Sequence, residues 1–439
     1  MIAIVESRAD RASEHVCTFL RELADWERLE DDTRPDAEGG GRWYRTEGAE
    51  LRSFADFHLD LEGPVEAFDC DPDLLVFASR HSGDTGPLLT GHFTGNFGPA
   101  EYGGDDHALA AACPNALVRL LEAFDEYAPE GYDVGMECTH HGPTDVGVPS
   151  LFAELGSDDE QWDDPDGAEA VARAILALRD VSPHRDRQLV GFGGTHYVPR
   201  FERIVRETSW AVGHVGSEWA LEDMGDPDEH RDVLEAAFDC SEADLAVVED
   251  ARPDLEAVLE DLGYRVVSET WLREVDDRPL ETVESIEREL GAIDDGVRFG
   301  TRRTGSFTVV DLPVEVIEAA EGIDPDRVWE AVEERTVAFE TTNGASRVGE
   351  RAAIDDEDVR EAIVEALAAV LEKKYDSVRI ERDAVVVEER AFDPNRASEL
   401  GVPEGPKFGQ LAAGEAVEVD GELVSPEAVR VDETHRFSI

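Results

Sequence analysis

Lysine is nearly absent from this chain, and several common sequence signatures are missing. The 439 residues include 40 bases, of which only Lys373, Lys374 and Lys407 are lysines. The five cysteines form no CxxC pair, which argues against a disulfide framework and a cysteine-rich zinc knuckle. No apolar run approaches the ~18 residues that a membrane span needs, and Met1 leads into a strand-like run rather than a charged leader. We therefore expect a cytoplasmic protein that does not enter a membrane.

The motifs that would assign a function at once are absent as well. The chain has no Walker A sequence, no GxGxxG fingerprint and no GxSxG elbow. Ser79, Ser82 and Thr139 are hydroxyl side chains close to strand-like runs, but no elbow supports any of them as a nucleophile. The function must be sought in other residue types.

Acidic residues are abundant, with 103 acids against 40 bases and a formal net charge of -63. An acidic tail for a basic partner is one explanation, and adaptation of the whole surface to molar salt is another. Residues 1–268 carry a net charge of -40 and residues 269–439 carry -23, so the charge is spread evenly and there is no tail. Because molar salt screens charges beyond about 3 Å, the composition favours a halophilic cytoplasm.

Apolar runs and helical periodicity alternate through the first part of the chain. Strands are predicted at 2–5, 74–78, 132–138, 188–192 and 245–248, and helices at 9–24, 108–127, 167–179, 229–238 and 253–262. Strands that alternate with helices, and that are apolar throughout, are typical of a sheet covered on both faces. The expected fold class is α/β, a mixed and mostly parallel sheet with helices on both faces, in a catalytic domain over residues 1–268.

The pattern changes after residue 268. Short helices are followed by short strands and turns, including Asp420-Gly421 between alternating residues, which is a good hairpin signal. A smaller α+β domain is predicted over residues 269–439. Its one histidine is His435, so the chemistry is expected in the first domain.

Histidines gather in three clusters, each close to the end of a strand-like run. The clusters are Ala78-Ser79-Arg80-His81-Ser82, Glu137-Cys138-Thr139-His140-His141-Gly142-Pro143-Thr144 and Gly193-Gly194-Thr195-His196-Tyr197. Imidazole titrates near neutral pH and is the commonest metal ligand. Because the carboxyl ends of strands in an open α/β sheet form the binding crevice, we expect the three clusters to meet around one pocket.

His140 and His141 can face one pocket only if their strand has ended, because neighbouring residues on a strand point to opposite faces. Gly142 and Pro143 indicate that it has ended, and Glu137 is near enough to orient an imidazole or bind a metal. The alternative is that one histidine is buried against backbone groups and the other is exposed.

The other two clusters also leave alternatives open. Gly193 and Gly194 permit close approach of a ligand, whose oxygen their amides can hold, or they form a plain tight turn. Arg80 is suited to a phosphate or to a surface ion pair. His15, His58, His107, His184 and His230 are expected to be surface or structural residues, and His214 is expected in the core.

The motifs together resemble the archaeal-type D-aminoacyl-tRNA deacylases, a family shared with plants. The residues that carry the resemblance are Ser79-Arg80-His81, Thr94-Gly95-Asn96, Tyr102-Gly103-Gly104, Glu137, Thr139 to Thr144, Gly193-Gly194 and His196-Tyr197. Their order and spacing match across about residues 1–268. Where the family pattern has a third glycine, this chain has Thr195.

The resemblance implies hydrolysis of the ester between a D-amino acid and the 3′ end of tRNA, with zinc as cofactor. It also implies a core similar to those of peptidyl-tRNA hydrolases and nucleoside phosphorylases. On this hypothesis the catalytic residues are Glu137, Thr139, His140 and His141. The metal ligands are sought among His81, His92 and His196. Substrate-binding residues are expected to be Ser79, Arg80, Thr94, Asn96, Tyr102, Gly193, Gly194 and Tyr197.

In the hypothetical mechanism His140 or His141 orients or deprotonates water, directly or through zinc. His81 and His196 bind the metal or the terminal adenosine. Steric exclusion selects D over L, and a carboxylate such as Glu137 holds the α-amino group.

Two other functions remain open. One is a phosphorylase-like or peptidyl-tRNA hydrolase-like enzyme on the same core, and the other is a non-catalytic tRNA- or metal-binding protein. The stretch from Gly401 to Gly414 also resembles a short segment of tRNA 3′-processing nucleases. Residues 269–439 are therefore a candidate RNA-contacting extension of a protein expected to be a monomer.

Overall fold

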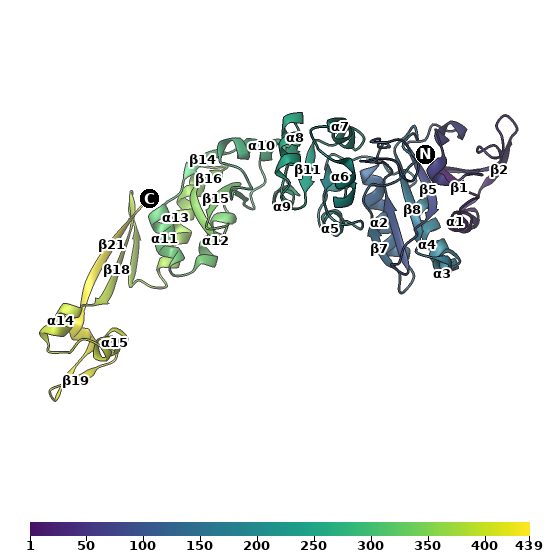
Figure 1. Cartoon of the computed structure of the whole chain (residues 1–439). Coiled ribbons are helices and arrows are strands. Elements are labelled where there is room, and N and C mark those ends of the chain that lie inside the picture. Colours follow the sequence, from purple (N-terminus) through teal and green to yellow (C-terminus); the bar gives the residue numbers. More distant parts are fainter. The chain divides into compact units, whose positions relative to one another are not determined.

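The computed structural model describes all 439 residues, which form two compact units, Met1–Asp276 and Asp277–Ile439 (Figure 1). The division falls one helix beyond the predicted boundary at residue 268. That helix, α9 (Glu269–Val275), packs in the first unit, where Trp271 lies against Trp210 with ring centroids 5.8 Å apart. The apolar face of α9 therefore decides to which unit the segment belongs.

An eight-stranded mixed sheet forms one part of the first unit, with the strand order β2-β3-β4-β1-β5-β8-β6-β7. Its strands are β1 (Ile2–Ser7), β2 (Glu27–Asp31), β3 (Gly41–Thr46), β4 (Ala49–Phe54), β5 (Leu74–Arg80), β6 (Leu88–His92), β7 (Asp133–Met136) and β8 (Ser150–Gly156). Pairing is parallel from β4 through β1 and β5 to β8, and again between β6 and β7. β1 and β8 are buried along their whole length, as strands covered on both faces should be.

A second, fully parallel sheet has the order β10-β9-β11-β12. Its strands are β9 (Gln188–Phe192), β10 (Ala211–Gly216), β11 (Leu245–Val248) and β12 (Arg265–Val266). The predicted mixed α/β class is confirmed, but its strands divide between two sheets. The segment after β7 joins them, since the Cys138 amide donates to the His196 carbonyl (2.8 Å) and the Thr139 amide to the Val215 carbonyl (2.9 Å).

Helices cover the sheets of the first unit. They are α1 (Arg11–Leu23), α2 (Pro114–Tyr127), α3 (Asp159–Trp162), α4 (Pro165–Leu176), α5 (Pro199–Glu207), α6 (Glu218–Met224), α7 (Arg231–Asp239), α8 (Pro253–Leu262) and α9, with 3-10 turns η1 (His58–Asp60) and η2 (Pro64–Ala67). α4 packs against both α1 and α2. The helix predicted from residue 108 begins at Pro114, because proline has no amide proton and suits the first helical position.

The second unit contains an antiparallel sheet of order β13-β15-β16-β14. Its elements are β13 (Arg298–Phe299), β14 (Thr308–Asp311), β15 (Ala338–Thr342), β16 (Arg347–Ile354) and helices α10 (Leu280–Glu289), α11 (Val314–Glu321), α12 (Pro325–Glu333) and α13 (Asp358–Leu371). Phe339, Leu367 and Val385 belong to its main core, and all three are fully buried.

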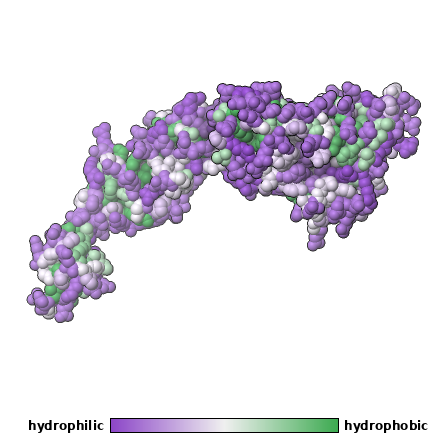
Figure 2. Space-filling model, in the orientation of Figure 1, coloured by the Kyte–Doolittle hydropathy of each residue, from purple (hydrophilic) through white to green (hydrophobic).

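The chain ends in a smaller group of strands and short helices. These are β17 (Ser377–Ile380), β18 (Ala384–Phe392), α14 (Pro394–Glu399), α15 (Pro406–Ala412), β19 (Val417–Val419), β20 (Glu422–Val424), η3 (Pro426–Val429) and β21 (Arg430–Ser438). The predicted hairpin at Asp420-Gly421 is present, and both residues have positive φ, of 50° and 88°. The face of each unit shown in Figure 2 is mostly hydrophilic. No helix of the structure combines the length and apolarity needed to cross a bilayer.

Candidate functional site

A cavity of about 470 Å³ lies where the loops after β5, β7 and β9 meet. It is lined by Phe57, Leu59, Ser79, Arg80, His81, Ser82, Tyr102, Glu137, His140, His141, Phe152, Glu154 and His196. His81, His140 and His196 come from the three separate clusters, so the structure does bring these clusters together. β5 and β7 run in opposite directions, because β6 pairs antiparallel with β8, and β9 belongs to the other sheet. The convergence therefore depends on this antiparallel pairing and on the hydrogen bonds that join the two sheets through Cys138 and Thr139.

The buried carboxylate of Glu137 is the centre of the polar network in this cavity. Its Oε2 lies 2.6 Å from His196 Nε2 and 3.7 Å from His140 Nε2, and its Oε1 lies 3.2 Å from His81 Nδ1. Burial by itself raises the pKa of Glu137, but the contacts with His196 and His81 outweigh it and hold that pKa well below its ordinary value. Glu137 is therefore a carboxylate that accepts hydrogen bonds from imidazoles.

A second buried carboxylate, Glu154 on β8, completes the network, and sequence reasoning missed it. Its oxygens lie 3.6 Å from His81 Nδ1 and 3.7 Å from His92 Nε2. Burial raises its pKa, but the contacts with both histidines outweigh this and lower it. A lone acid inside the apolar strand Ser150–Gly156 was the signal available in the sequence, because an unpaired charge is rarely buried.

The two carboxylates surround one imidazole on both sides. Burial lowers the pKa of His81, but Glu137 and Glu154 outweigh it and raise the pKa to about 10. The pKa of His196 is likewise lowered by burial but raised overall, to about 10, by Cys138 and Glu137. His81 and His196 are thus cationic partners of carboxylates rather than free bases.

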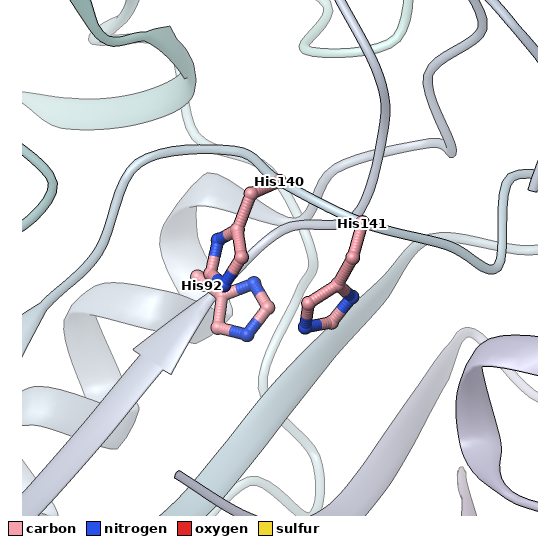
Figure 3. A group of neighbouring side chains, drawn as sticks. All are labelled: His92, His140 and His141. Atoms are coloured by element: carbon pink, nitrogen blue, oxygen red, sulfur yellow. The ribbon is translucent and has the colours of Figure 1, made fainter. Parts of the chain in front are cut away.

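His92, His140 and His141 form a different group (Figure 3). Their ring centroids are 4.2 to 4.8 Å apart, and the rings turn toward one another. Each directs Nδ1 at a nearby backbone carbonyl: His92 at Phe93 (3.0 Å), His140 at Cys138 (2.9 Å) and His141 at Gly142 (2.7 Å). If Nδ1 carries the proton and donates, each Nε2 keeps a lone pair.

The pKa values of this trio do not all move in one direction. Burial lowers the pKa of His140 well below its ordinary value and that of His141 to about 4. His92 is fully buried, and burial lowers its pKa, but Glu154 outweighs burial and raises it; its Nε2 has no hydrogen-bond partner. His140 and His141 are therefore neutral imidazoles, and a neutral imidazole whose second nitrogen donates to a carbonyl is the usual state of metal-bound histidine.

Three groups of side chains bring possible metal-ligand atoms within 4.8 Å of one another inside the site. They are His92-His140-His141, Cys138-His140-His196 and His81-Glu137-Glu154. The expected ligands His81, His92 and His196 are therefore distributed over three groups rather than one. The all-histidine group fits a metal best, because its rings are held by carbonyls while His81 and His196 are bonded to carboxylates.

Glycines hold the His140-His141 turn against the loop that carries Tyr102. A Cβ on Gly142 would lie 2.4 Å from the Gly104 amide nitrogen, and one on Gly103 would lie 2.3 Å from the Leu59 carbonyl oxygen. Gly103 and Gly104 also have positive φ. The Tyr102 ring, 68% exposed, is thereby fixed at the rim of the cavity.

Arg80 reaches the cavity between two aromatic rings. Its guanidinium carbon lies 4.9 Å from the Phe57 ring centroid and 5.1 Å from that of Trp162. The Asp10 carboxylate accepts the Arg80 amide (3.0 Å) and the Ser79 hydroxyl (3.3 Å). Arg80 is thus positioned by stacking and a fixed backbone, not by the surface ion pair considered from sequence.

Several predicted residues lie outside the cavity lining. Thr139 uses its hydroxyl between His214 Nδ1 (2.9 Å) and the Val215 amide (3.0 Å), and Asn96 donates to the carbonyls of Gly103 and Asp105. Thr94 is buried. Tyr197 does not line the cavity, but its hydroxyl lies 3.2 Å from His81 Nε2.

Gly193 and Gly194 also lie outside the cavity lining. The Gly193 amide donates to the Gly216 carbonyl (2.7 Å), so it cannot stabilise an oxyanion. Both glycines have positive φ and pack against Glu249. They shape the turn that delivers His196.

An α/β protein in which buried imidazoles and carboxylates gather around one cavity has the side chains that an acid–base enzyme uses. The D-aminoacyl-tRNA deacylase family model matches residues 68–267, a range that contains all three clusters. The chain belongs to this family.

Curated relatives match the whole chain. The D-aminoacyl-tRNA deacylase of Halorubrum lacusprofundi is 52% identical, covering 100% of this chain and 97% of the relative. That of Natronomonas pharaonis is 53% identical, covering 100% of both. A crystal structure of a conserved protein of unknown function, AF0625, is 28% identical with a TM-score of 0.54, over 61% of this chain and 94% of that one.

Proposed function

We propose that this chain hydrolyses the ester that joins a D-amino acid to the 3′ end of tRNA, and that the reaction takes place in the cavity around Glu137. The observation that carries the proposal is the convergence of His81, His140 and His196 on one cavity within the family-matched region. Full-length relatives named D-aminoacyl-tRNA deacylase support it. The products are a free D-amino acid and tRNA, as quality control of translation in a halophilic cytoplasm requires.

We further propose zinc as the cofactor, held by His92, His140 and His141. The donor set supports this, because each ring is oriented by a carbonyl and the buried Nε2 of His92 has no hydrogen-bond partner. Three protein ligands with a remaining open position are typical of catalytic zinc. When bound, the ion would supply Lewis acidity and lower the pKa of a water molecule.

Glu137 and His196 are the proton-transfer pair of the proposal. The 2.6 Å separation of Glu137 Oε2 and His196 Nε2 lets a proton be held between them. The Glu137 carboxylate accepts the proton of the attacking water as the water oxygen bonds to the ester carbon. Cationic His196 donates its proton to the 3′ oxygen when the carbon–oxygen ester bond breaks, and the proton on Glu137 then passes to His196. His81, held between Glu137 and Glu154, keeps the pair oriented.

The outer part of the cavity is assigned to the tRNA end of the substrate. The exposed ring of Tyr102 offers a stacking surface for the terminal adenine, and Arg80 offers guanidinium donors to a phosphate. Phe57, Leu59 and Phe152 form the apolar wall. Selection of D-amino acids over L-amino acids then depends on which substituent of the α-carbon this wall excludes.

Hydrolysis of matched D- and L-tyrosyl-tRNA in concentrated KCl tests the function. Release of D-tyrosine, with little release of L-tyrosine, is expected from the wild type, and a chelator should remove the activity until zinc is restored. The His140→Ala/His141→Ala double variant should lose deacylation while keeping its melting temperature in the absence of metal. Turnover undiminished in this variant would refute the site.

The same experiment separates the alternatives. Cleavage of peptidyl-tRNA in preference to D-aminoacyl-tRNA would favour a peptidyl-tRNA hydrolase-like enzyme. Tight tRNA binding without any hydrolysis would favour a binding protein.

A further inference from the structure

An acid-free segment stands out in the second unit. Residues 296–310 contain no aspartate or glutamate, although the chain has 103 such residues in 439, and they carry Arg298, Arg302 and Arg303. The exposed part is the loop Thr301–Ser306, with the sequence Thr-Arg-Arg-Thr-Gly-Ser, which we name the arginine loop. The second unit thus has an exposed stretch where guanidinium and hydroxyl groups replace carboxylates.

The arginine loop connects β13 with β14, the two edge strands of the four-stranded sheet, and its backbone is fixed. The Gly300 amide donates to the Val337 carbonyl (2.9 Å), the Thr301 amide to that of Glu333 (2.8 Å) and the Arg302 amide to that of Thr336 (3.1 Å). A Cβ on Gly300 would lie 2.2 Å from the Thr336 carbonyl oxygen. Only glycine allows this close approach, so the first part of the loop is anchored against residues 333–337.

The two arginines are oriented but still accessible. Arg302 donates from Nε (3.0 Å) and Nη2 (2.8 Å) to Asp355, and Arg303 from Nη2 to Asp277 and from Nη1 to the Gly300 carbonyl. Both side chains remain 48% exposed. These contacts leave Nη1 of Arg302 and Nε of Arg303 without an acidic partner, so each guanidinium keeps donors for a ligand.

We propose that the arginine loop binds the phosphate backbone of tRNA, outside the catalytic cavity. The inference rests on the proposed function and adds a second, sequence-independent contact to the same substrate. Arginine, serine and threonine side chains are the usual donors to nucleic-acid phosphates, and the loop offers all three types on a rigid backbone. The contact gives affinity for tRNA as a whole and does not distinguish D from L.

The segment Gly401–Gly414 fits this role less well. It includes α15, whose Lys407 is its only base, and Lys407 Nζ donates to the Glu418 carbonyl (2.6 Å). The arginine loop, not this segment, is therefore the RNA-contacting part that the charges of the second unit favour.

The test compares two substrates in the full-length protein. One is D-tyrosyl-tRNA, and the other is the D-tyrosyl ester of adenosine, which has only the terminal nucleoside. Charge reversal by Arg302→Glu/Arg303→Glu should raise KM for D-tyrosyl-tRNA about tenfold in the lowest KCl that keeps the protein folded. It should leave kcat/KM for the adenosine ester unchanged. Log affinity for uncharged tRNA should also depend less steeply on log salt, by about 2 for two lost phosphate contacts.

A matched control variant and a conservative variant test whether the effect on tRNA binding belongs to the arginine loop. Arg379→Glu/Arg436→Glu makes the same charge change in the same unit, at arginines that are 57% and 50% exposed and paired with Glu388 and Glu381. This control should leave KM for tRNA within threefold of wild type. Arg302→Lys/Arg303→Lys keeps the charge and should retain tRNA binding and its salt dependence.

Several outcomes would overturn the proposal. These are an unchanged KM for tRNA in the charge-reversed variant, an equal rise in the control, or an equal loss on the adenosine ester. A wild-type protein that does not cleave D-tyrosyl-tRNA would instead refute the proposed function. In that case the salt dependence of uncharged tRNA binding still decides the role of the loop.

Discussion

The two units use similar residue types in different topologies. In the first unit, β5 pairs in parallel with both neighbours inside a mixed sheet, β9 lies in a parallel sheet, and the loops after them meet the loop after β7 at the cavity. In the second unit all pairings are antiparallel, so neighbouring strands end at opposite edges. Eleven of the twelve histidines lie in the first unit and only His435 in the second. Hydrogen bonds between the two sheets, such as that from the Cys138 amide to the His196 carbonyl, are what let distant clusters share one pocket.

The one histidine of the second unit provides a natural control. His435 Nε2 lies 3.4 Å from Glu389 and 3.7 Å from Glu433, distances similar to those around Glu137. Its side chain is 42% exposed, however, whereas His92 is fully buried. Water competes for the exposed groups around His435. The same residue types at similar distances therefore have a much smaller interaction free energy there than in the buried site. Burial, not composition, makes the difference.

The largest expected effect comes from removing the buried charge at the centre of the site. Glu137→Gln keeps the shape of the side chain but cannot exchange a proton with His196, and deacylation should fall about 1000-fold. Glu389→Gln makes the same chemical change beside His435 and should leave activity at the wild-type level. Single-turnover hydrolysis of D-tyrosyl-tRNA measures both. If Glu137→Gln keeps more than a tenth of the wild-type activity, the proposed proton-transfer role of Glu137 is wrong.

A smaller effect is expected in the pH dependence of stability. Burial lowers the pKa of His214 to about 4, whereas an unfolded histidine titrates near 6.5. Between these values the unfolded chain binds a proton that the folded unit does not. The contribution of His214 to the free energy of unfolding is therefore fully present above about pH 6.5. It declines toward pH 4, by about 2 kcal/mol at pH 5.

Urea denaturation at pH 7 and pH 5 checks this expectation. His214→Gln can still donate to the Ala110 carbonyl, which His214 Nε2 contacts at 2.8 Å, but it does not titrate. This variant should lose about 2 kcal/mol of the pH dependence of the first unit. The second unit has no buried histidine and should not show this component. Equal pH dependence in wild type and variant would contradict the assignment.

The smallest effect distinguishes structure from catalysis at Thr139. Thr139→Val removes the hydroxyl between His214 and the Val215 amide and should destabilise the first unit by about 1 kcal/mol, with activity within threefold of wild type. Thr336→Val in the second unit removes a buried hydroxyl bonded to the Val332 carbonyl (2.9 Å) and should cost a similar amount. Thermal unfolding and deacylation assays measure both. A selective loss of activity in Thr139→Val would restore its catalytic role.

Much of the first unit could be predicted from local patterns. The apolar runs indicate the strands at 74–78 and 188–192 at the positions where the structure has them. The Gly-Gly and Gly-Pro pairs likewise indicate where the clusters lie. The division of the strands between two sheets could not be predicted, because it depends on non-local hydrogen bonds such as that from Thr139 to Val215. The place of α9 depended in the same way on the packing of Trp271 against Trp210.

The site shows the same limit. Residue type and spacing singled out Glu137, His140 and His196, yet not which imidazole contacts which carboxylate. Glu154 went unnoticed because its importance comes only from its neighbours His81 and His92. Gly193 was misjudged as an oxyanion donor because a sequence does not reveal that its amide is bonded to Gly216.

By itself the sequence determined the chemistry that is available: imidazoles and carboxylates next to turns, an acidic surface and the family likeness. The tertiary structure alone decided how those groups are divided into a trio of His92, His140 and His141, whose Nδ1 atoms face backbone carbonyls, and a charged set around Glu137 and Glu154. The reason is that protonation depends on burial and on contacts at about 3 Å, which residues far apart in the chain make only after folding.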